Sequence, residues 1–359
     1  MKYKRAEYLQ PGFPTFTKTD MAGSSFKLPS LSSPISAKEN FRLMYTHHKP
    51  CWMPYYATDI QDFPAPHLYY NADVEKEDPT DFIDWFGVAW VYVPIAGGVM
   101  PKPGTQFLDD ITRWESKVVF PDLDKVDFEG IAAKFMAEQY DPNRVLNFEV
   151  GQGCTERLVA LLGGYTEAMV ALALEPEAVK AFFDRFADFT IEYIDRVLEV
   201  APIDKVTYMD DWGTERDTFF SEAMMEDLVY EPTARIFAAV KEKGICIEHH
   251  CCGNIGRFLP YMLKMGTDII QIQRRTNDIP RFKREHGDKI CFNVSLEGVE
   301  QGIMPQLTDE ELVSAVRETV DLYGAGGGAY LKNNIPTPQQ EWLLAQELYC
   351  YSREKYDNE

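Results

Sequence analysis

The segment Ser221–His250, SEAMMEDLVYEPTARIFAAVKEKGICIEHH, contains the pattern that decides the fold. Its first part, Ser221–Lys243, has the apolar spacing of an amphipathic helix, and Lys243-Gly244 is a helix stop signal. The run Ile245–His250 has the length and composition of a buried strand. A helix that leads directly into an apolar strand is one unit of a parallel α/β fold.

The same alternation extends over most of the chain. Further strand-length apolar runs are predicted at Cys51–Tyr56, Val88–Val93, Val145–Val150, Val206–Met209, Asp268–Gln273, Ile290–Val294 and Gly328–Lys332. Further helices are predicted at Ala37–His48, Asp127–Gln139, Glu175–Glu199, Arg257–Met265, Asp309–Leu322 and Pro338–Tyr351. Continuous apolar runs are typical of parallel strands that are covered on both faces. About eight such units over roughly 310 residues predict an α/β fold with a single (β/α)8 TIM barrel.

The N-terminal region differs from the rest of the chain. It is rich in Ser, Pro, Thr and Gly and shows no sustained period. We therefore predict a loosely ordered N-terminal arm over residues 1–37 and one barrel over residues 38–359. The arm is expected to lie over the barrel or over a partner subunit, and a homodimer is one assembly that would allow this.

Charge and cysteine content limit the partners and the compartment. The 359 residues include 36 Lys and Arg and 57 Asp and Glu, which gives a net charge of −21. Such a charge repels nucleic acid and anionic membrane surfaces, and no stretch approaches the roughly 18 apolar residues of a membrane span. Seven cysteines, an odd number, do not indicate a disulfide framework. The expected location is the cytoplasm, without nucleic acid or membrane partners.

The strongest candidate site is the strand end Ile245–Asn254, ICIEHHCCGN. Alternation along a strand places Glu248, His250 and Cys252 on one face, toward the barrel mouth where such enzymes act. His250 and Cys252 are about 7 Å apart at their Cα atoms, which lets both converge on one Zn²⁺. The alternative is a core histidine bonded to a carboxylate, with inert thiols beside it.

Acidic residues follow two other predicted strands. Asp210 and Asp211 could ligate a metal or act as acid and base; alternatively, one of them caps a neighbouring loop or helix. Asp211 lies nearer the rim. Glu149 is the charged residue near the end of its predicted strand. It is either a catalytic carboxylate or the ion-pair partner of Arg157.

Aromatic residues suggest the walls of a substrate pocket. Trp85, Phe86, Trp90 and Trp212 lie close to predicted strand ends and could line a pocket, although ordinary packing explains them equally well. Asn333, after the last predicted strand, is a further candidate substrate-binding residue.

Three stretches resemble the uroporphyrinogen decarboxylase superfamily, particularly its corrinoid-dependent methyltransferase branch. They are 84–90 with 120–124, 208–213, and 250–254 with the late 326–328 turn and 335–338. The resemblance spans about residues 38–352 and implies a barrel enzyme. Decarboxylases of the family carry an arginine-rich segment after the first strand, whereas Tyr55–Asp62 contains no arginine and two aspartates. Because arginine is the natural partner of a polycarboxylate, uroporphyrinogen is not the expected substrate.

The methyltransferase branch holds Zn²⁺ on a His-x-Cys-Gly motif, which His250, Cys252 and Gly253 match. Thiol-methylating members have another cysteine after the late glycine-rich turn, where this chain has Asn333 and Asn334. The third ligand therefore stays open. The candidates are Glu248, Glu149, Asp211 and Cys291.

The resemblance implies transfer of a methyl group from a small donor to a corrinoid protein. Zn²⁺ would activate the leaving group, and an acid nearby would protonate it. The aromatic candidates suit a methoxylated aromatic donor, as in the component of an O-demethylase. Two alternatives remain: a metal-independent decarboxylase or lyase that uses Asp210 and Asp211, and a non-catalytic protein that binds a tetrapyrrole or a corrinoid protein.

Overall fold

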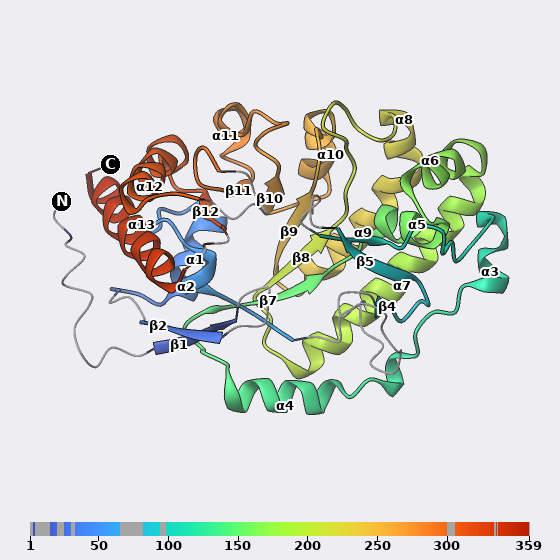
Figure 1. The fold of residues 1–359 in the computed structure, drawn as a ribbon, viewed down its shortest axis with the longest axis horizontal. Coiled ribbons are helices and arrows are strands. Elements are labelled where there is room, and N and C mark those ends of the chain that lie inside the picture. Colours follow the sequence, from blue (N-terminus) through green and yellow to red (C-terminus); the bar gives the residue numbers. More distant parts are fainter. Residues whose placement is uncertain are drawn as a thin grey trace. The chain divides into compact units, whose positions relative to one another are not determined.

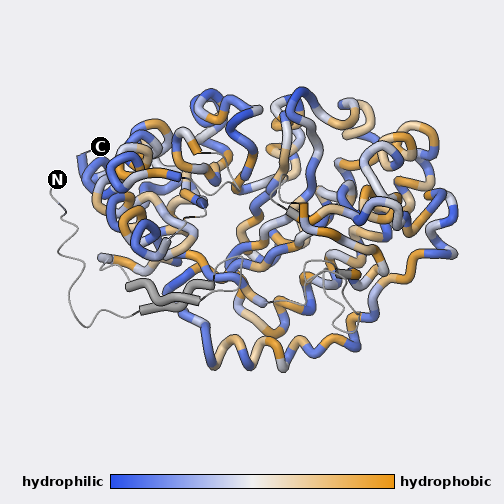
Figure 2. The backbone as a smooth tube through the Cα atoms, in the orientation of Figure 1, coloured by the Kyte–Doolittle hydropathy of each residue, from blue (hydrophilic) through white to orange (hydrophobic). Residues whose placement is uncertain are grey.

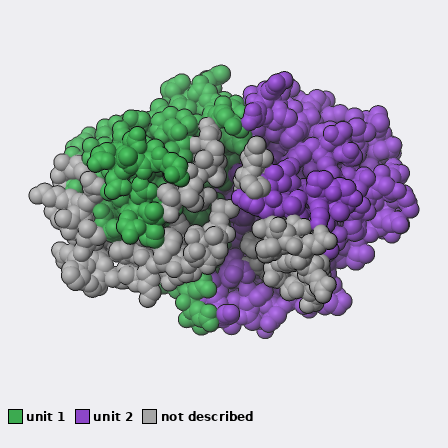
Figure 3. All heavy atoms as spheres, viewed as in Figure 1, with its two compact units in different colours: residues 1–62, 136–147, 268–359 green, residues 63–135, 148–267 purple. Residues whose placement is uncertain are grey.

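The computed structural model describes residues 3, 15–19, 25–29, 33–64, 82–93, 98–299, 306–333, 335 and 337–358 (Figure 1). The chain divides into two compact units, which Figure 3 shows in green and purple. The first unit contains residues 1–62, 136–147 and 268–359, and the second contains residues 63–135 and 148–267.

The main sheet has seven strands, in the hydrogen-bonding order β12-β11-β10-β9-β8-β7-β3. Their bounds are β3 (Ile60–Asp62), β7 (Val145–Val150), β8 (Lys205–Met209), β9 (Cys246–Cys251), β10 (Ile269–Ile272), β11 (Cys291–Val294) and β12 (Ala329–Leu331). The pairs β3/β7, β8/β9, β10/β11 and β11/β12 are parallel. The α/β class with a parallel sheet is confirmed, whereas a closed eight-stranded barrel is not.

In the first unit, helices accompany β10, β11 and β12. They are α1 (Ala37–Tyr45), α2 (Tyr56–Asp59), α11 (Ile279–His286), α12 (Asp309–Tyr323) and α13 (Pro338–Asn358). The predicted strand Cys51–Tyr56 is not one of the strands: Tyr55 makes only an isolated parallel bridge to Leu331, and β3 begins after α2. The run was apolar because its side chains are buried, Trp52 against Tyr349 of α13 among them.

The N-terminal arm contains more structure than predicted. Strands β1 (Thr15–Thr19) and β2 (Ser25–Pro29) pair in an antiparallel hairpin. Polar and apolar residues alternate over residues 25–28, which is the signal of a strand, whereas Phe16 is the one apolar residue of β1. Patterns this short do not stand out from the composition of the region.

The second unit contains a three-stranded antiparallel sheet in addition to β8 and β9. Its strands are β4 (Phe82–Ile83), β5 (Ala89–Val93) and β6 (Gly98–Pro101), in that order. The predicted barrel strand Val88–Val93 is therefore β5 of this smaller sheet. Trp90 is buried and Tyr92 is exposed, although residues two apart share one face of a strand, so burial changes along β5 rather than between its faces. An all-apolar sequence could not show this difference.

The helices of the second unit are α3 (Trp114–Lys117), α5 (Cys154–Leu162), α6 (Tyr165–Leu174), α7 (Pro176–Val200), α8 (Glu222–Met224), α9 (Tyr230–Glu242) and α10 (Leu259–Lys264). Helix α4 (Phe128–Glu138) begins in this unit and ends in the other. The predicted single helix Ser221–Lys243 is interrupted by a π-helical turn at Met225–Val229. Hydrophilic and hydrophobic residues alternate along the helices (Figure 2), as expected of helices with one apolar face.

Helices α5 and α6 were not predicted, although they matter most for the site. They are joined at Gly163-Gly164, where Gly163 has a φ of 78° and ends α5. Among the described residues, no single helix combines the length and the apolar composition of a membrane span. Helices α5 and α6 meet that test only as a pair, bent by 110°.

Candidate metal centre

Asp211, His250 and Cys252 converge at the ends of two neighbouring parallel strands in the second unit. The register of β8 and β9 pairs Met209 with His250, so the residues that follow both strands meet. One ligand atom from each of the three residues lies within 4.8 Å of the other two. The Sγ of Cys252 is 3.4 Å from Nε2 of His250, which is 3.8 Å from Oδ1 of Asp211.

These distances and atom types fit a zinc ion. Bonds of about 2.0–2.3 Å place the ligand atoms of a tetrahedral Zn²⁺ roughly 3.3–3.8 Å apart. Nitrogen, sulfur and carboxylate oxygen are all ligands of zinc, and three protein ligands leave a fourth position for a reactant. The expected convergence of His250 and Cys252 is present, and Asp211 supplies the third donor of the cluster.

Glu248 lies elsewhere, contrary to its prediction as a metal ligand. Its side chain belongs to the expected face of β9. However, Glu248 comes two residues before His250, and it therefore lies roughly 7 Å further from the end of the strand. Its carboxylate pairs with Nζ of Lys205 at 2.7 Å, and both side chains are buried. The alternation of side chains along a strand predicts which face a residue occupies. It does not predict how far from the strand end the metal ligands lie, so the sequence pattern could not exclude Glu248.

Asp210 and Asp211 are adjacent but have different environments. Asp210 is fully buried and accepts hydrogen bonds from the backbone N–H of Glu156 at 2.9 Å and from Nε1 of Trp212 at 2.9 Å. It also accepts from the N–H of Thr155 at 3.3 Å. Asp210 therefore caps α5, which agrees with the alternative that one of the two aspartates caps a neighbouring helix. Burial raises the pKa of Asp210 to about 7 despite these hydrogen bonds.

Glu156 is a member of the site that the sequence reasoning missed. It lies in the first turn of α5, and its carboxyl group is hydrogen-bonded to that of Asp211. Burial, followed by the charges of Asp211 and Asp210, raises the pKa of Glu156 well above its usual range. A glutamate in the first helical turn after the strand Val145–Val150 was the available signal, but α5 itself had not been predicted.

The acidic groups of this site are not balanced by a lysine or arginine in the part of the chain that the structure describes. Among the described residues, no Lys or Arg forms an ion pair with Asp210, Asp211 or Glu156. The pKa of the Cys252 thiol is raised well above its usual value by burial and then by Asp211 and Glu156. Buried like charges need a proton or a cation, and a divalent cation would stabilise the carboxylates and the thiolate together.

The predicted catalytic residue Glu149 lies in β7 and is partly buried. Its suggested partner, Arg157, instead donates to Oδ2 of Asp84 at 2.6 Å, and both of these side chains are fully buried. Arg157 also lies over the ring of Phe86, 4.3 Å from its centroid. The alternative of an ion pair between Glu149 and Arg157 is therefore wrong.

Most of the aromatic candidates belong to the hydrophobic core rather than to a pocket wall. The ring of Phe86 packs on Phe120, and that of Trp85 packs on Tyr193. Trp212 is completely buried against His249, with ring centroids 4.4 Å apart. These contacts correct the pocket assignment and follow the alternative of ordinary packing. Trp90 is the exception that does line a cavity.

Asn333, in the first unit, uses its side chain within the fold. Its Oδ1 accepts a hydrogen bond of 2.6 Å from the backbone N–H of Leu296, and the residue is buried. Cys291, one of the candidates for the third ligand, directs its thiol to the carbonyl oxygen of Met44 at 3.4 Å. Asn333 thus holds the chain after β11 through this oxygen and stays a predicted substrate-binding residue, whereas Cys291 is not one of the three converging residues.

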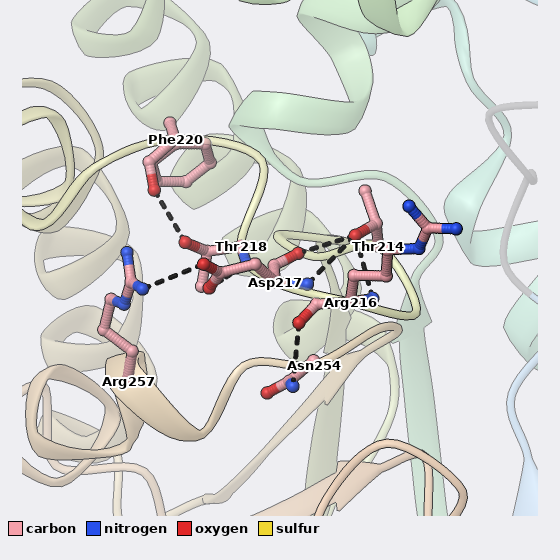
Figure 4. Close-up of polar contacts among 7 residues, drawn as sticks. All are labelled: Thr214, Arg216, Asp217, Thr218, Phe220, Asn254 and Arg257. Atoms are coloured by element: carbon pink, nitrogen blue, oxygen red, sulfur yellow. Dashed lines mark hydrogen bonds and ion pairs between the residues drawn. The ribbon is translucent and has the colours of Figure 1, made fainter.

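The two loops that follow Asp211 and Cys252 are bound to each other (Figure 4). Asn254 donates from its backbone N–H to the carbonyl of Thr214 at 2.6 Å, and Arg257 pairs with Asp217 at 2.9 Å. Gly253 has a φ of 84°, and a Cβ there would lie 2.1 Å from the backbone of Gly213. This close approach of two backbones requires glycine and fixes the two ligand-bearing loops.

Parallel strands with a cluster of ligating side chains at their ends define an α/β protein with a candidate catalytic metal centre. The chain belongs to the uroporphyrinogen decarboxylase (URO-D) family, whose sequence model matches residues 87–331. The family resemblance seen in the sequence is thus confirmed, and membership supports an enzyme.

A solved methyltransferase structure shares the fold. A methyltransferase from Methanosarcina mazei is 15% identical, with 72% of each chain covered and a TM-score of 0.53. A xylose isomerase domain protein from Alicyclobacillus acidocaldarius is 11% identical, with 71% of this chain and 88% of that chain covered and a TM-score of 0.35. No curated protein matches the chain.

Proposed function

We propose that this protein is a zinc-dependent methyltransferase that moves a methyl group from a small donor to a corrinoid protein in the cytoplasm. The observation that carries the proposal is the convergence of Asp211, His250 and Cys252 within 4.8 Å. Membership of the URO-D family and the shared fold with a methyltransferase support it. Glu149 keeps its proposed place as a further catalytic carboxylate.

The acidity of the site favours this reaction over decarboxylation of a polycarboxylate. Asp210, Asp211 and Glu156 lie together, and Tyr55–Asp62 offers no arginine. Such a site repels an anionic substrate. Asp210, which a metal-independent decarboxylase would use as acid or base, is fully engaged in capping α5.

The residues of this chain would bind the metal and position the donor. Asp211, His250 and Cys252 would hold Zn²⁺, which would supply Lewis acidity at the leaving atom of the donor. The bond between the methyl carbon and the leaving atom would break, and its electron pair would stay with the leaving atom. A reduced corrinoid of the partner protein would supply the electron pair of the new bond to carbon. One proton from the medium completes the leaving group as an alcohol or amine.

The test measures zinc and methyl transfer together. The protein is mixed with reduced corrinoid protein and a panel of methylamines, methanol and methoxylated aromatics, and methylation of the cobalt is followed by absorbance. We expect one bound zinc, and at least a thousandfold loss of transfer in His250→Ala, with zinc also lost. Asp211→Asn should weaken zinc binding as well. Zinc-free protein that gains no activity with added zinc would contradict the proposal, and unchanged turnover in His250→Ala would make His250 structural.

A further inference from the structure

A small cavity adjoins the metal centre within the second unit. Its volume is about 60 Å³. Trp90, Met100 and Val159 contribute its apolar wall, and Gln152, Glu156 and Tyr165 contribute its polar wall. Glu156 connects the two sites, because the residue lines the cavity and its carboxyl group is hydrogen-bonded to that of Asp211. A molecule in the cavity would therefore lie beside the candidate ligands.

Gln152 is the feature that points to a ligand. The residue follows β7, is 1% exposed, and lines the cavity. Its Oε1 has no hydrogen-bond partner among the described residues. An unpaired buried amide oxygen destabilises the folded state, so a native protein normally gives such an atom a partner. With the amide group turned so that this oxygen faces the cavity, a hydrogen-bond donor bound there would supply one.

The volume limits the size of that donor. An engineered cavity of roughly 150 Å³ holds one benzene molecule, so a cavity of this size has room for roughly one to four non-hydrogen atoms. A methoxylated aromatic ring is larger than benzene and does not fit. This limit agrees with the finding that Trp85, Phe86 and Trp212 pack in the core.

The groups around the cavity select a cation. Gln152 and Glu156 offer oxygen acceptors, and the aromatic rings of Trp90 and Tyr165 are the surfaces that favour methylated ammonium ions. The nearby carboxyl groups of Asp210 and Asp211 add negative potential. We propose that the cavity binds a small methylated ammonium ion. This inference rests on the proposed function, since it makes that ion the methyl donor, once its N–H proton has passed to the medium and left a nitrogen lone pair for the metal.

Calorimetric titration of the zinc-loaded protein tests the pocket without turnover. Methylammonium and trimethylammonium should bind, whereas anisole should give no heat of binding. Gln152→Leu should weaken methylammonium binding at least tenfold, because it removes a buried hydrogen bond to a charged donor. Gln346→Leu, a change at a buried glutamine in α13 of the first unit, is the matched control and should bind as the parent does.

A second variant covers the case in which Gln152→Leu does not fold. Val159→Ala enlarges the cavity and should improve binding of tetramethylammonium relative to methylammonium at least threefold. An unchanged ratio, or binding of anisole in preference to ammonium ions, would overturn the assignment. Zinc-dependent methyl transfer from aromatic donors alone would also overturn it and leave the proposed function intact. Gln152-dependent ammonium binding with no transfer from any donor would support the pocket and refute the methyltransferase.

Discussion

Two parts of the second unit each contain a buried aspartate that accepts a hydrogen bond from a tryptophan indole. Asp84 accepts from Nε1 of Trp90 at 3.0 Å, and Asp210 accepts from Nε1 of Trp212 at 2.9 Å. They differ in charge balance. Arg157 neutralises Asp84 at 2.6 Å, whereas Asp210 lies beside further acidic groups that no Lys or Arg in the described residues pairs with.

The difference separates structural from functional acidity. Both segments belong to stretches that resemble the family, so the motif alone does not distinguish them. A buried acid with its own guanidinium is complete without a ligand. A buried acidic group without one needs a proton or a cation from outside the chain, and this makes the ends of β8 and β9 the candidate centre.

The largest effect on stability is expected at the neutralised aspartate. Arg157→Met keeps the approximate volume but leaves the carboxylate of Asp84 buried and unpaired. We expect the free energy of unfolding to fall by about 3–5 kcal/mol, as measured by urea denaturation at pH 7. Adding Asp84→Asn should restore part of this loss. If the single variant is as stable as the parent, Asp84 is not held by its ion pair and the comparison fails.

A smaller effect, with a defined pH dependence, is expected at Asp210. Its folded pKa of about 7 lies above its unfolded value of 3.8. The folded state therefore binds this proton more tightly, and the stability that it contributes is present below pH 3.8 and lost as the pH rises to about 7. In protein stripped of metal, Asp210→Asn should remove a decline of about 3–4 kcal/mol over this range. Identical stability profiles for parent and variant between pH 4 and 7 would show that Asp210 is ionised throughout.

The sequence predicted the parts of the fold and the site that depend on a short local pattern. The strands β7 to β12 are apolar runs bounded by turn residues, and they were located within one or two residues. The pairing of β5 was not predictable, because the apolar run Ala89–Val93 does not differ in composition from a strand of the main sheet. Likewise, β1 and β2 are short and lie in a region whose composition suggests no order.

The pattern of one strand was sufficient to predict that two of the site residues converge. It was not sufficient to predict the site residues that other elements contribute. His250 and Cys252 are two residues apart, so the pleat of a single strand places both. Asp211 comes from the next strand, and its selection over Glu248 depends on the β8/β9 register. Glu156 comes from a helix that the apolar pattern did not reveal. Contacts between separate elements are set by packing, which one sequence does not display.

The smallest effect on zinc affinity is expected for a substitution of Glu248. This substitution tests, within β9, the comparison between buried acids that are neutralised by the chain and those that are not. Lys205 already neutralises this carboxylate at 2.7 Å, as Arg157 neutralises Asp84. Glu248→Gln should therefore change zinc affinity less than threefold, although a buried Lys205 left without its partner lowers the free energy of unfolding. Competition with a zinc chelator measures the affinity, and Asp211→Asn is the matched variant that should lose it. If Glu248→Gln weakens zinc binding as much as Asp211→Asn does, the ion pair with Lys205 does not exclude Glu248 from the metal. Charge neutralisation inside the chain would then fail to distinguish structural from ligating acids.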